Sequence, residues 1–117
     1  MKLLEQPGGI VMSPYVTRLQ WDYPYGWAPN NLIAIEGLRH YNASEDADRL
    51  SKKFLTMIIE SFRKDGTIRE KYNVVTRSDE VDVTAGYHEN VIGFGWTNGT
   101  FLVLLHQLPD AKRRQLM

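Results

Sequence analysis

The chain has 117 residues, of which 43% are hydrophobic and 24% are charged, an ordinary composition for one small globular domain. Its formal net charge is zero and it has no run of about eighteen apolar residues, so nothing argues for nucleic acid or a membrane as partner. Cysteine is absent, which excludes disulfides and cysteine metal sites. This weakly favours a cytoplasmic, reducing compartment, and the N-terminus lacks the apolar core of a signal peptide, but the localisation stays unknown.

Residues 1–28 are rich in proline and glycine, which punctuate loops. We expect mainly ordered loop there, with at most a short turn of helix. The pattern changes at Pro29, because proline is favoured in the first turn of a helix and apolar residues then recur at helical spacing. The spacing predicts a helix over 29–41.

A second, longer helix is predicted from about residue 42 to residue 65. Asn42 and Glu45 have the spacing of a capping box, and Asp65 followed by Gly66 is a stop signal. One apolar stripe at steps of three and four follows the helix and comprises Ala47, Leu50, Phe54, Met57, Ile58 and Phe62.

Residues 66–96 show no helical pattern. Val81 and Val83 alternate with polar residues, which predicts a short strand and leaves open a short β-hairpin. A third helix is predicted at 98–108, ended by Pro109 and followed by a polar, basic tail. The consecutive apolar residues 101–105 make this helix apolar nearly all round, which is typical of a helix covered by something larger or by a second copy of the chain.

Three helices joined by long, aromatic, glycine-rich loops seldom stand alone. Loops longer than about fifteen residues are uncommon in compact domains and are often functional. We therefore expect residues 1–117 to form a single segment of a larger enzyme.

Three motifs carry the chemistry-bearing residues. The first is Gln20-Trp21-Asp22-Tyr23-Pro24-Tyr25-Gly26-Trp27-Ala28-Pro29, with Pro7-Gly8-Gly9 before it and Glu36-Gly37-Leu38 after it. The second is Glu70-Lys71-Tyr72-Asn73-Val74, and the third is Gly93-Phe94-Gly95-Trp96-Thr97-Asn98-Gly99. In this order they resemble the trehalase signatures QWD-x-P-x-GWAP, EKYDV and GFGWTNG. The resemblance extends from about residue 7 to residue 105.

The resemblance implies a fold and a reaction. Trehalases are (α/α)6 toroids of the six-hairpin type, so we expect a mainly all-α segment from the C-terminal part of such a toroid. They split α,α-trehalose into two glucose molecules with inversion, and they use no metal or cofactor. An inverting glycosidase needs two carboxyl groups about 6.5–9.5 Å apart, one to protonate the leaving oxygen and one to activate water.

Glu70 matches the family's general base, so the resemblance implies that it deprotonates the attacking water. Taken locally, a glutamate between Arg69 and Lys71 is more often an exposed member of an ion pair. The flanking motifs favour the catalytic interpretation. The family's general acid lies upstream of the QWD motif, in helices that this chain does not contain, so we expect the isolated chain to be inactive.

The resemblance also implies sugar contacts. An indole packs on the apolar face of a sugar ring while an amide or carboxylate binds its hydroxyls, which suits Gln20 and Trp21. Asp22 either contacts the sugar or holds the loop. Three further aromatic residues fit the core and the pocket equally well, namely Trp27, Phe94 and Trp96.

One departure concerns the loop before the third motif, where most trehalases have a glycine-rich run followed by Glu-Tyr, a glutamate that contacts sugar. An ungapped alignment puts Tyr87 at its position, and Glu89 two residues later is the candidate substitute. Whether Glu89 or Tyr87 takes that place stays open. The three histidines lack metal-site spacing, which makes no metal the expectation; they are His40, His88 and His106.

Three functions compete. The chain is part of a trehalose hydrolase whose remaining part lies elsewhere, or an inactive remnant that acts as an association or structural module, or part of a six-hairpin glycosidase for another sugar. The first is favoured, because the QWD motif is more specific than the shared fold. The expected partner is a small sugar, and the chain either needs the rest of the domain or self-associates.

Overall fold

The computed structural model describes residues 3–84 and 88–117. Its helices are α1 (Ala28–His40), α2 (Ser44–Asp65), α3 (Gly95–Gln107) and α4 (Asp110–Arg114). Four short strands accompany them: β1 (Glu5–Gln6), β2 (Gly9–Ile10), β3 (Tyr25–Trp27) and β4 (Lys71–Asn73). The mainly helical fold predicted from the sequence is confirmed. Among the described residues, no helix is both long enough and apolar enough to cross a membrane.

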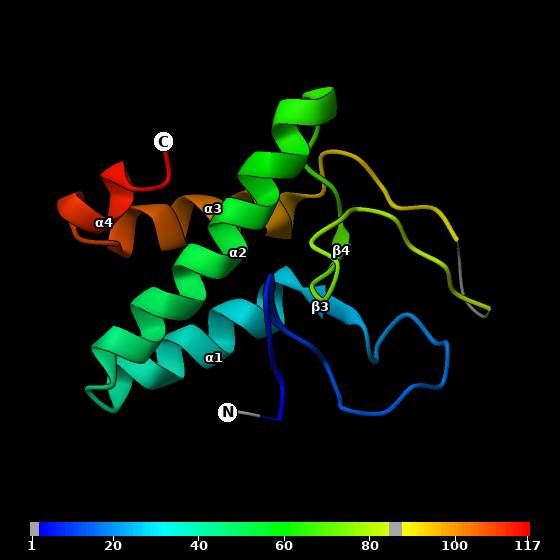
Figure 1. The fold of residues 1–117 in the computed structure, drawn as a ribbon, viewed down its shortest axis with the longest axis horizontal. Coiled ribbons are helices and arrows are strands. Elements are labelled where there is room, and N and C mark those ends of the chain that lie inside the picture. Colours follow the sequence, from blue (N-terminus) through cyan, green and yellow to red (C-terminus); the bar gives the residue numbers. More distant parts are fainter. Residues whose placement is uncertain (1–2, 85–87) are drawn as a thin grey trace.

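The helix α2 is the longest element, and it crosses obliquely over α1 and α3 (Figure 1). Acidic residues in its first turn and basic residues in its last turn complement the helix dipole. It ends at Gly66, whose φ of 73° is the left-handed conformation that glycine adopts without strain. The predicted capping box is wrong, because the N-cap is Ala43, without a side-chain cap, and Asn42 lies outside the helix with a φ of 60°.

The apolar stripe of α2 is confirmed as the centre of the main core. Its buried members include Leu50, Phe54 and Ile58, and both α1 and α3 pack against this helix. Phe62, at the end of the predicted stripe, is 49% exposed. The core therefore follows the helix only as far as neighbouring elements cover it.

The N-terminal part contains strands where the sequence predicted mainly loop. β1 pairs with β2, and β3 pairs with β4, both antiparallel. Residues 3–27 contain no helix before α1 begins at Ala28. Gly26 permits this arrangement, since a Cβ there would meet the Val74 side chain and the Ile10 carbonyl. Two chain segments can approach the strand closely only because this residue has no side chain.

The strand predicted around Val81 and Val83 is wrong in the described residues. The alternation in burial is present, since Val83 is buried and its polar neighbours are exposed. Among residues 3–84 and 88–117, no named strand pairs with this segment to complete a ladder. The backbone of Asp82 bonds to the phenol of Tyr25 instead, and Thr84 N donates to the Arg18 carbonyl. The apolar–polar alternation indicated which side chains face inward, but a β-strand also requires a neighbouring strand with which to form backbone hydrogen bonds.

The C-terminal part differs in two respects from its prediction. α3 begins at Gly95, three residues earlier than predicted, and the polar tail forms the short helix α4 after Pro109. Leu104 is buried, whereas Leu102 is 64% exposed and Val103 is 41% exposed. Part of the apolar run is therefore uncovered in this chain. Figure 1 shows that α4 and the β3–β4 pair lie on opposite sides of α2.

Candidate functional site

The three sequence motifs meet at one junction. The register of β3 and β4 places Trp27 opposite Lys71, which joins the first motif to the second. The Thr97 hydroxyl at the start of α3 donates to the Glu70 carbonyl over 3.1 Å, which joins the third motif to the second. The motifs are distant in sequence and adjacent in the fold. We call this region the motif junction.

Glu70 is buried at the motif junction, with 2% of its surface exposed. Its carboxylate Oε2 accepts a hydrogen bond from Lys71 Nζ at 2.8 Å. Its amide donates to the Val91 carbonyl at 2.9 Å, so its backbone is held by the segment before α3 as well as by Thr97. The exposed glutamate that the local sequence favours is excluded. Glu70 is a fixed, buried carboxylate.

Lys71 is entirely buried beside it. Its ammonium lies 3.2 Å from the Glu89 carbonyl oxygen and 5.1 Å from the centre of the Trp27 ring. A cation over an indole face is attracted by the ring quadrupole. Taking two charges out of water costs several kcal/mol per ion, so a buried pair is weak evidence of stabilisation and calls for another explanation.

Four aromatic rings cluster beside the pair. Trp21 stacks on Trp27 with centroids 3.8 Å apart and planes 8° apart. Trp96 meets both edge-on, at 6.4 Å from Trp21 and 5.5 Å from Trp27. Phe94 tilts against Trp96 at 4.6 Å. Trp27 is 1% exposed and Trp21 is 45% exposed, so the buried indole supports the one that reaches the surface.

Gln20 and Asp22 shape the loop that carries Trp21. The Trp27 indole N–H donates to the Gln20 carbonyl at 2.8 Å. Asp22 is buried, and its Oδ2 accepts hydrogen bonds from the amide and the hydroxyl of Thr17. Asp22 therefore holds the loop, as one of its two sequence interpretations required.

Three buried polar atoms near this loop have no hydrogen-bond partner among residues 3–84 and 88–117. They are Gln20 Oε1, Asp22 Oδ1 and Trp96 Nε1. A buried polar group without a partner costs about 1–3 kcal/mol. The aromatic cluster is therefore flanked by acceptors and a donor at which a further hydrogen-bonding group would be stabilising.

Glu89 is exposed, and its carbonyl rather than its carboxylate contacts Lys71. Tyr87, the alternative to it, lies outside the described residues together with Ala85 and Gly86. Asn90 fastens this loop, because its side-chain amide donates to the Lys71 and Asp79 carbonyls and its Oδ1 accepts from Lys71 N.

Sequence reasoning missed two residues of the junction. Lys71 stands inside the second motif, so its position next to Glu70 was a usable signal, but a lysine beside a glutamate is more often an exposed ion-pair partner. Asn90 gave no signal, because an asparagine in a polar loop is common and its contacts come from distant segments. His40 and His106 are exposed, and no three potential metal ligands gather in the described part of the chain.

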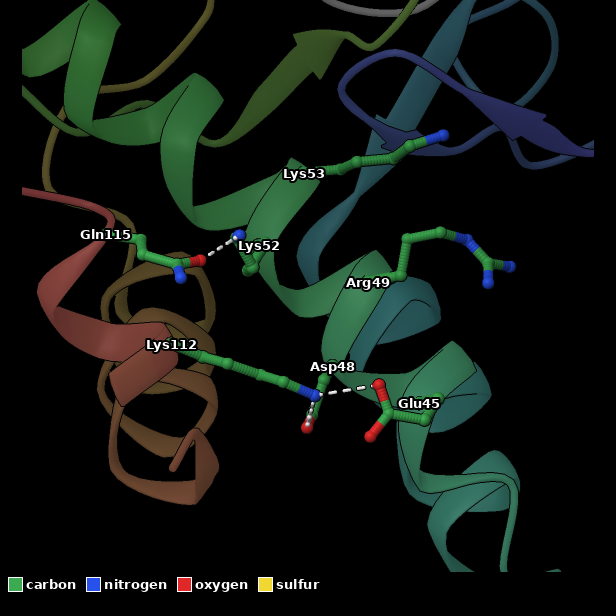
Figure 2. Close-up of a pocket in the computed structure, with 7 residues that line it drawn as sticks. All are labelled: Glu45, Asp48, Arg49, Lys52, Lys53, Lys112 and Gln115. Atoms are coloured by element: carbon green, nitrogen blue, oxygen red, sulfur yellow. Dashed lines mark hydrogen bonds and ion pairs between the residues drawn. The ribbon is translucent and has the colours of Figure 1, made fainter. Parts of the chain in front are cut away.

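A second charged region lies between α2 and α4, in a pocket of about 390 Å³ (Figure 2). Lys112 Nζ contacts Asp48 Oδ2 at 2.8 Å and Glu45 Oε2 at 3.0 Å, and Lys52 donates to Gln115 at 2.6 Å. These bonds join α4 to α2. None of the three motifs lines this charged groove, whose residues are Glu45, Asp48, Arg49, Lys52, Lys53, Lys112 and Gln115.

The ion pairs around the charged groove lower the pKa values of two carboxyl groups. Burial tends to raise the pKa of Asp48, but hydrogen bonds from Lys112 and Arg39 outweigh it and lower that pKa below its usual value. Hydrogen bonds from Arg49 and Lys53 lower the pKa of Glu5 from 4.5 to about 2. These shifts come from ion pairs that connect secondary-structure elements, and they are explained without a ligand.

The chain is similar to known proteins over nearly its whole length. The model of the trehalase family matches residues 1–109. A periplasmic trehalase of Xanthomonas axonopodis pv. citri is 37% identical over 108 residues, which are 92% of this chain and 19% of that protein. A cytosolic neutral trehalase of Emericella nidulans is 36% identical over an alignment of 130 residues, covering 96% of this chain and 17% of that protein.

A solved structure agrees as well. The neutral trehalase Nth1 from Saccharomyces cerevisiae matches with a TM-score of 0.75 and 31% identity, over 98% of this chain and 20% of that one. The predicted fold class, a mainly helical part of an (α/α)6 toroid, is confirmed by this match. The chain spans about a fifth of the length of the relatives it matches. By its family model, its relatives and its fold, the chain belongs to the trehalase family.

Proposed function

We propose that this chain is the base-bearing segment of a glycosidase that hydrolyses α,α-trehalose with inversion, and that Glu70 is the general base. Family membership supports the substrate, since the relatives named above are trehalases. The position of Glu70 supports the role, since the three motifs meet around it.

The observation that carries the proposal is the fixed, buried carboxylate of Glu70. A general base must be held within reach of the proton that it removes. Lys71 Nζ holds the Glu70 carboxylate at 2.8 Å, the Thr97 hydroxyl donates to the Glu70 carbonyl, and the Glu70 amide donates to the Val91 carbonyl. Burial excludes bulk solvent, and an inverting mechanism requires only one water between its two carboxyl groups.

The sugar contacts in this proposal lie on the aromatic cluster. The exposed face of Trp21 packs on a sugar ring, with Trp27 behind it as a support and Phe94 beside Trp96 as part of the wall. The partnerless atoms of Gln20, Asp22 and Trp96 bind sugar hydroxyls. Glu89 remains the candidate for a further contact.

The general acid comes from outside these residues in our proposal. The acid protonates the leaving oxygen while Glu70 takes a proton from water, and the water oxygen forms a bond to the anomeric carbon as the glycosidic bond breaks. The two carboxyl groups must therefore lie on opposite sides of the sugar. This division of labour explains why a segment of this length would need the rest of the domain for activity.

The test supplies the proposed general acid from a relative. The chain is co-expressed with the Xanthomonas periplasmic trehalase from which the matching C-terminal segment has been removed, and glucose release from trehalose is measured. We expect activity with the wild-type chain and a loss of about 10²–10⁴-fold with Glu70→Gln, the range for general acid–base groups. Glu60→Gln is the matched control. Glu60 lies on α2 outside the motif junction, where it pairs with Arg77.

The products test the stereochemistry. Inversion forms β-glucose from the half that water attacks, while the leaving half departs as α-glucose. Proton NMR during the first turnovers should therefore show both anomers in equal amounts. Release of α-glucose alone would contradict an inverting mechanism.

The second candidate function is an inactive association module. The exposure of Leu102 and Val103 favours it, because uncovered apolar residues on a helix mark contact surfaces. A wild-type chain that binds the truncated relative and restores no glucose release would support this alternative.

A further inference from the structure

Lys71 occupies an unusual position at the motif junction. Its ammonium reaches the Glu70 carboxylate at 2.8 Å, the Glu89 carbonyl at 3.2 Å and the face of Trp27 at 5.1 Å. No part of its side chain is exposed. One cation thus contacts the proposed base, the loop after the undescribed residues 85–87, and the aromatic cluster.

The backbone of Lys71 is held as firmly as its side chain. Lys71 is the first residue of β4 and lies opposite Trp27, and the Asn90 side chain bonds to both its amide and its carbonyl. Lysine ordinarily has a flexible four-carbon stem. Here the backbone end of the stem is held by Asn90 and the ammonium end by the Glu70 carboxylate and the Glu89 carbonyl.

The ion pair between Glu70 and Lys71 does not by itself connect distant elements. The two residues are neighbours in sequence, so their ion pair closes no loop and joins no distant elements. The backbone ladder of β3 and β4 already makes that connection. Burying both charges is costly, and apolar residues of similar volume at these two positions would often make the fold equally or more stable. The geometry therefore calls for a role in the site.

We propose that Lys71 is a positioning residue that holds the Glu70 carboxylate in one orientation and couples it to the loop carrying Glu89. The proposal rests on the proposed function of Glu70. The ammonium of Lys71 donates to the Glu70 carboxylate and the Glu89 carbonyl, and it lies over the Trp27 ring. The Glu89 carbonyl fixes the ammonium from one side, so a displacement of that loop would also displace the base.

The test uses the co-expressed enzyme described above, with Lys71→Met, which keeps the length of the stem and removes the charge. A misplacement of about 1 Å of a reacting group can cost about 10²-fold in rate. We expect kcat to fall by about 10²-fold while KM changes by less than about threefold, because the sugar contacts lie elsewhere. Lys53→Met is the matched control, since Lys53 pairs with Glu5. Rates are expressed per folded molecule, measured by near-ultraviolet circular dichroism.

A second variant keeps the test decisive where Lys71→Met folds poorly. Glu70→Gln with Lys71→Met leaves no buried charge without its partner, and we expect its residual rate to equal that of Glu70→Gln alone. A further loss of tenfold or more, or a Lys71→Met enzyme within about threefold of wild type, would overturn the positioning role. Full activity of Glu70→Gln would instead overturn the proposed function itself, so the two failures are distinguishable.

Discussion

The motif junction and the charged groove both contain buried carboxylates paired with lysine, yet the two regions differ in what their ion pairs connect. In the groove, Asp48 bonds to Arg39 of α1 and Lys112 of α4, so one carboxylate ties three helices together. At the junction, Glu70 pairs with the residue next to it. The comparison shows that a buried ion pair is informative about function where it adds no connection between distant elements.

The two regions also differ in the solvent exposure of their lysines. Lys112 is 28% exposed and Lys71 is 0% exposed. A partly hydrated ion pair gains little and loses little when it forms, whereas a fully buried pair strongly disfavours the removal of one partner. A buried carboxylate paired with lysine therefore has a structural use in the charged groove (Figure 2) and an expected chemical use at the motif junction.

The largest expected effect is on activity. The isolated chain should release no glucose from trehalose above the blank, because the proposed reaction requires a general acid from outside it and such groups contribute about 10²–10⁴-fold. A coupled glucose assay on the purified chain, with and without the truncated relative, measures this. Glucose release by the isolated chain that Glu70→Gln abolishes would show that the motif junction is complete by itself.

The next effect compares the stability of the two regions. Lys71→Met leaves the Glu70 carboxylate buried without its adjacent cation and should lower the free energy of unfolding by roughly 3–5 kcal/mol, as expected when one partner of a buried pair is removed. Lys112→Met should shift the urea midpoint less, because water can replace the lost ammonium at Asp48. Equal shifts for the two variants would erase the distinction between the regions.

A smaller effect is expected from acid. The pKa of Glu5 is lowered from 4.5 to about 2, so its ion pairs with Arg49 and Lys53 stabilise the fold fully above pH 4.5. Stability falls as the pH drops from 4.5 toward 2, because the unfolded chain binds the proton first. Asp48, whose pKa is also lowered, acts in the same direction below its usual value of 3.8.

Urea titrations across this pH range check the acid effect. Glu5→Gln should reduce stability at neutral pH and flatten the decline between pH 4.5 and about 2. Glu80→Gln, at an exposed residue of the loop after β4, is the control and should leave the profile unchanged. An unaltered acid decline in Glu5→Gln would show that these ion pairs contribute nothing.

The smallest effect concerns association. Leu102 is 64% exposed on α3, and the isolated chain is predicted to self-associate through its uncovered apolar residues. Leu102→Gln should weaken that association in sedimentation velocity runs over a range of concentrations. Tyr41→Gln removes exposed aromatic surface from the connection between α1 and α2 and should not weaken it. A wild-type chain that is monomeric at every concentration would contradict the prediction.

The sequence predicted the helices well because their signals are local. The stripe of α2 and the stop at Gly66 depend on residues within a few positions of one another. The strand pair β3–β4 could not be foreseen, since Tyr25 and Asn73 meet only after α1 and α2 have reversed the chain. α4 was missed because a five-residue segment with four charged residues and one alanine carries no apolar periodicity, and Lys112 bonds to α2 across the fold.

The candidate site also combines residues that the sequence indicates with residues that only the fold brings together. Glu70 and the aromatic residues were proposed from their resemblance to family motifs. What each does depends on burial, which the motif does not encode: Trp27 is a support and Trp21 reaches the surface. Asn90 and the ammonium of Lys71 become visible only once segments from three parts of the chain are seen together.

The central claim is that Glu70 acts as a base rather than as a structural carboxylate, and azide tests it most directly. In the co-expressed enzyme, Glu70→Ala removes the base, and azide needs no base because its nitrogen attacks the anomeric carbon without losing a proton. We predict that Glu70→Ala is inactive with water alone and that azide restores cleavage with β-glucosyl azide as product. A Glu70→Ala enzyme that hydrolyses trehalose at the wild-type rate would contradict the account.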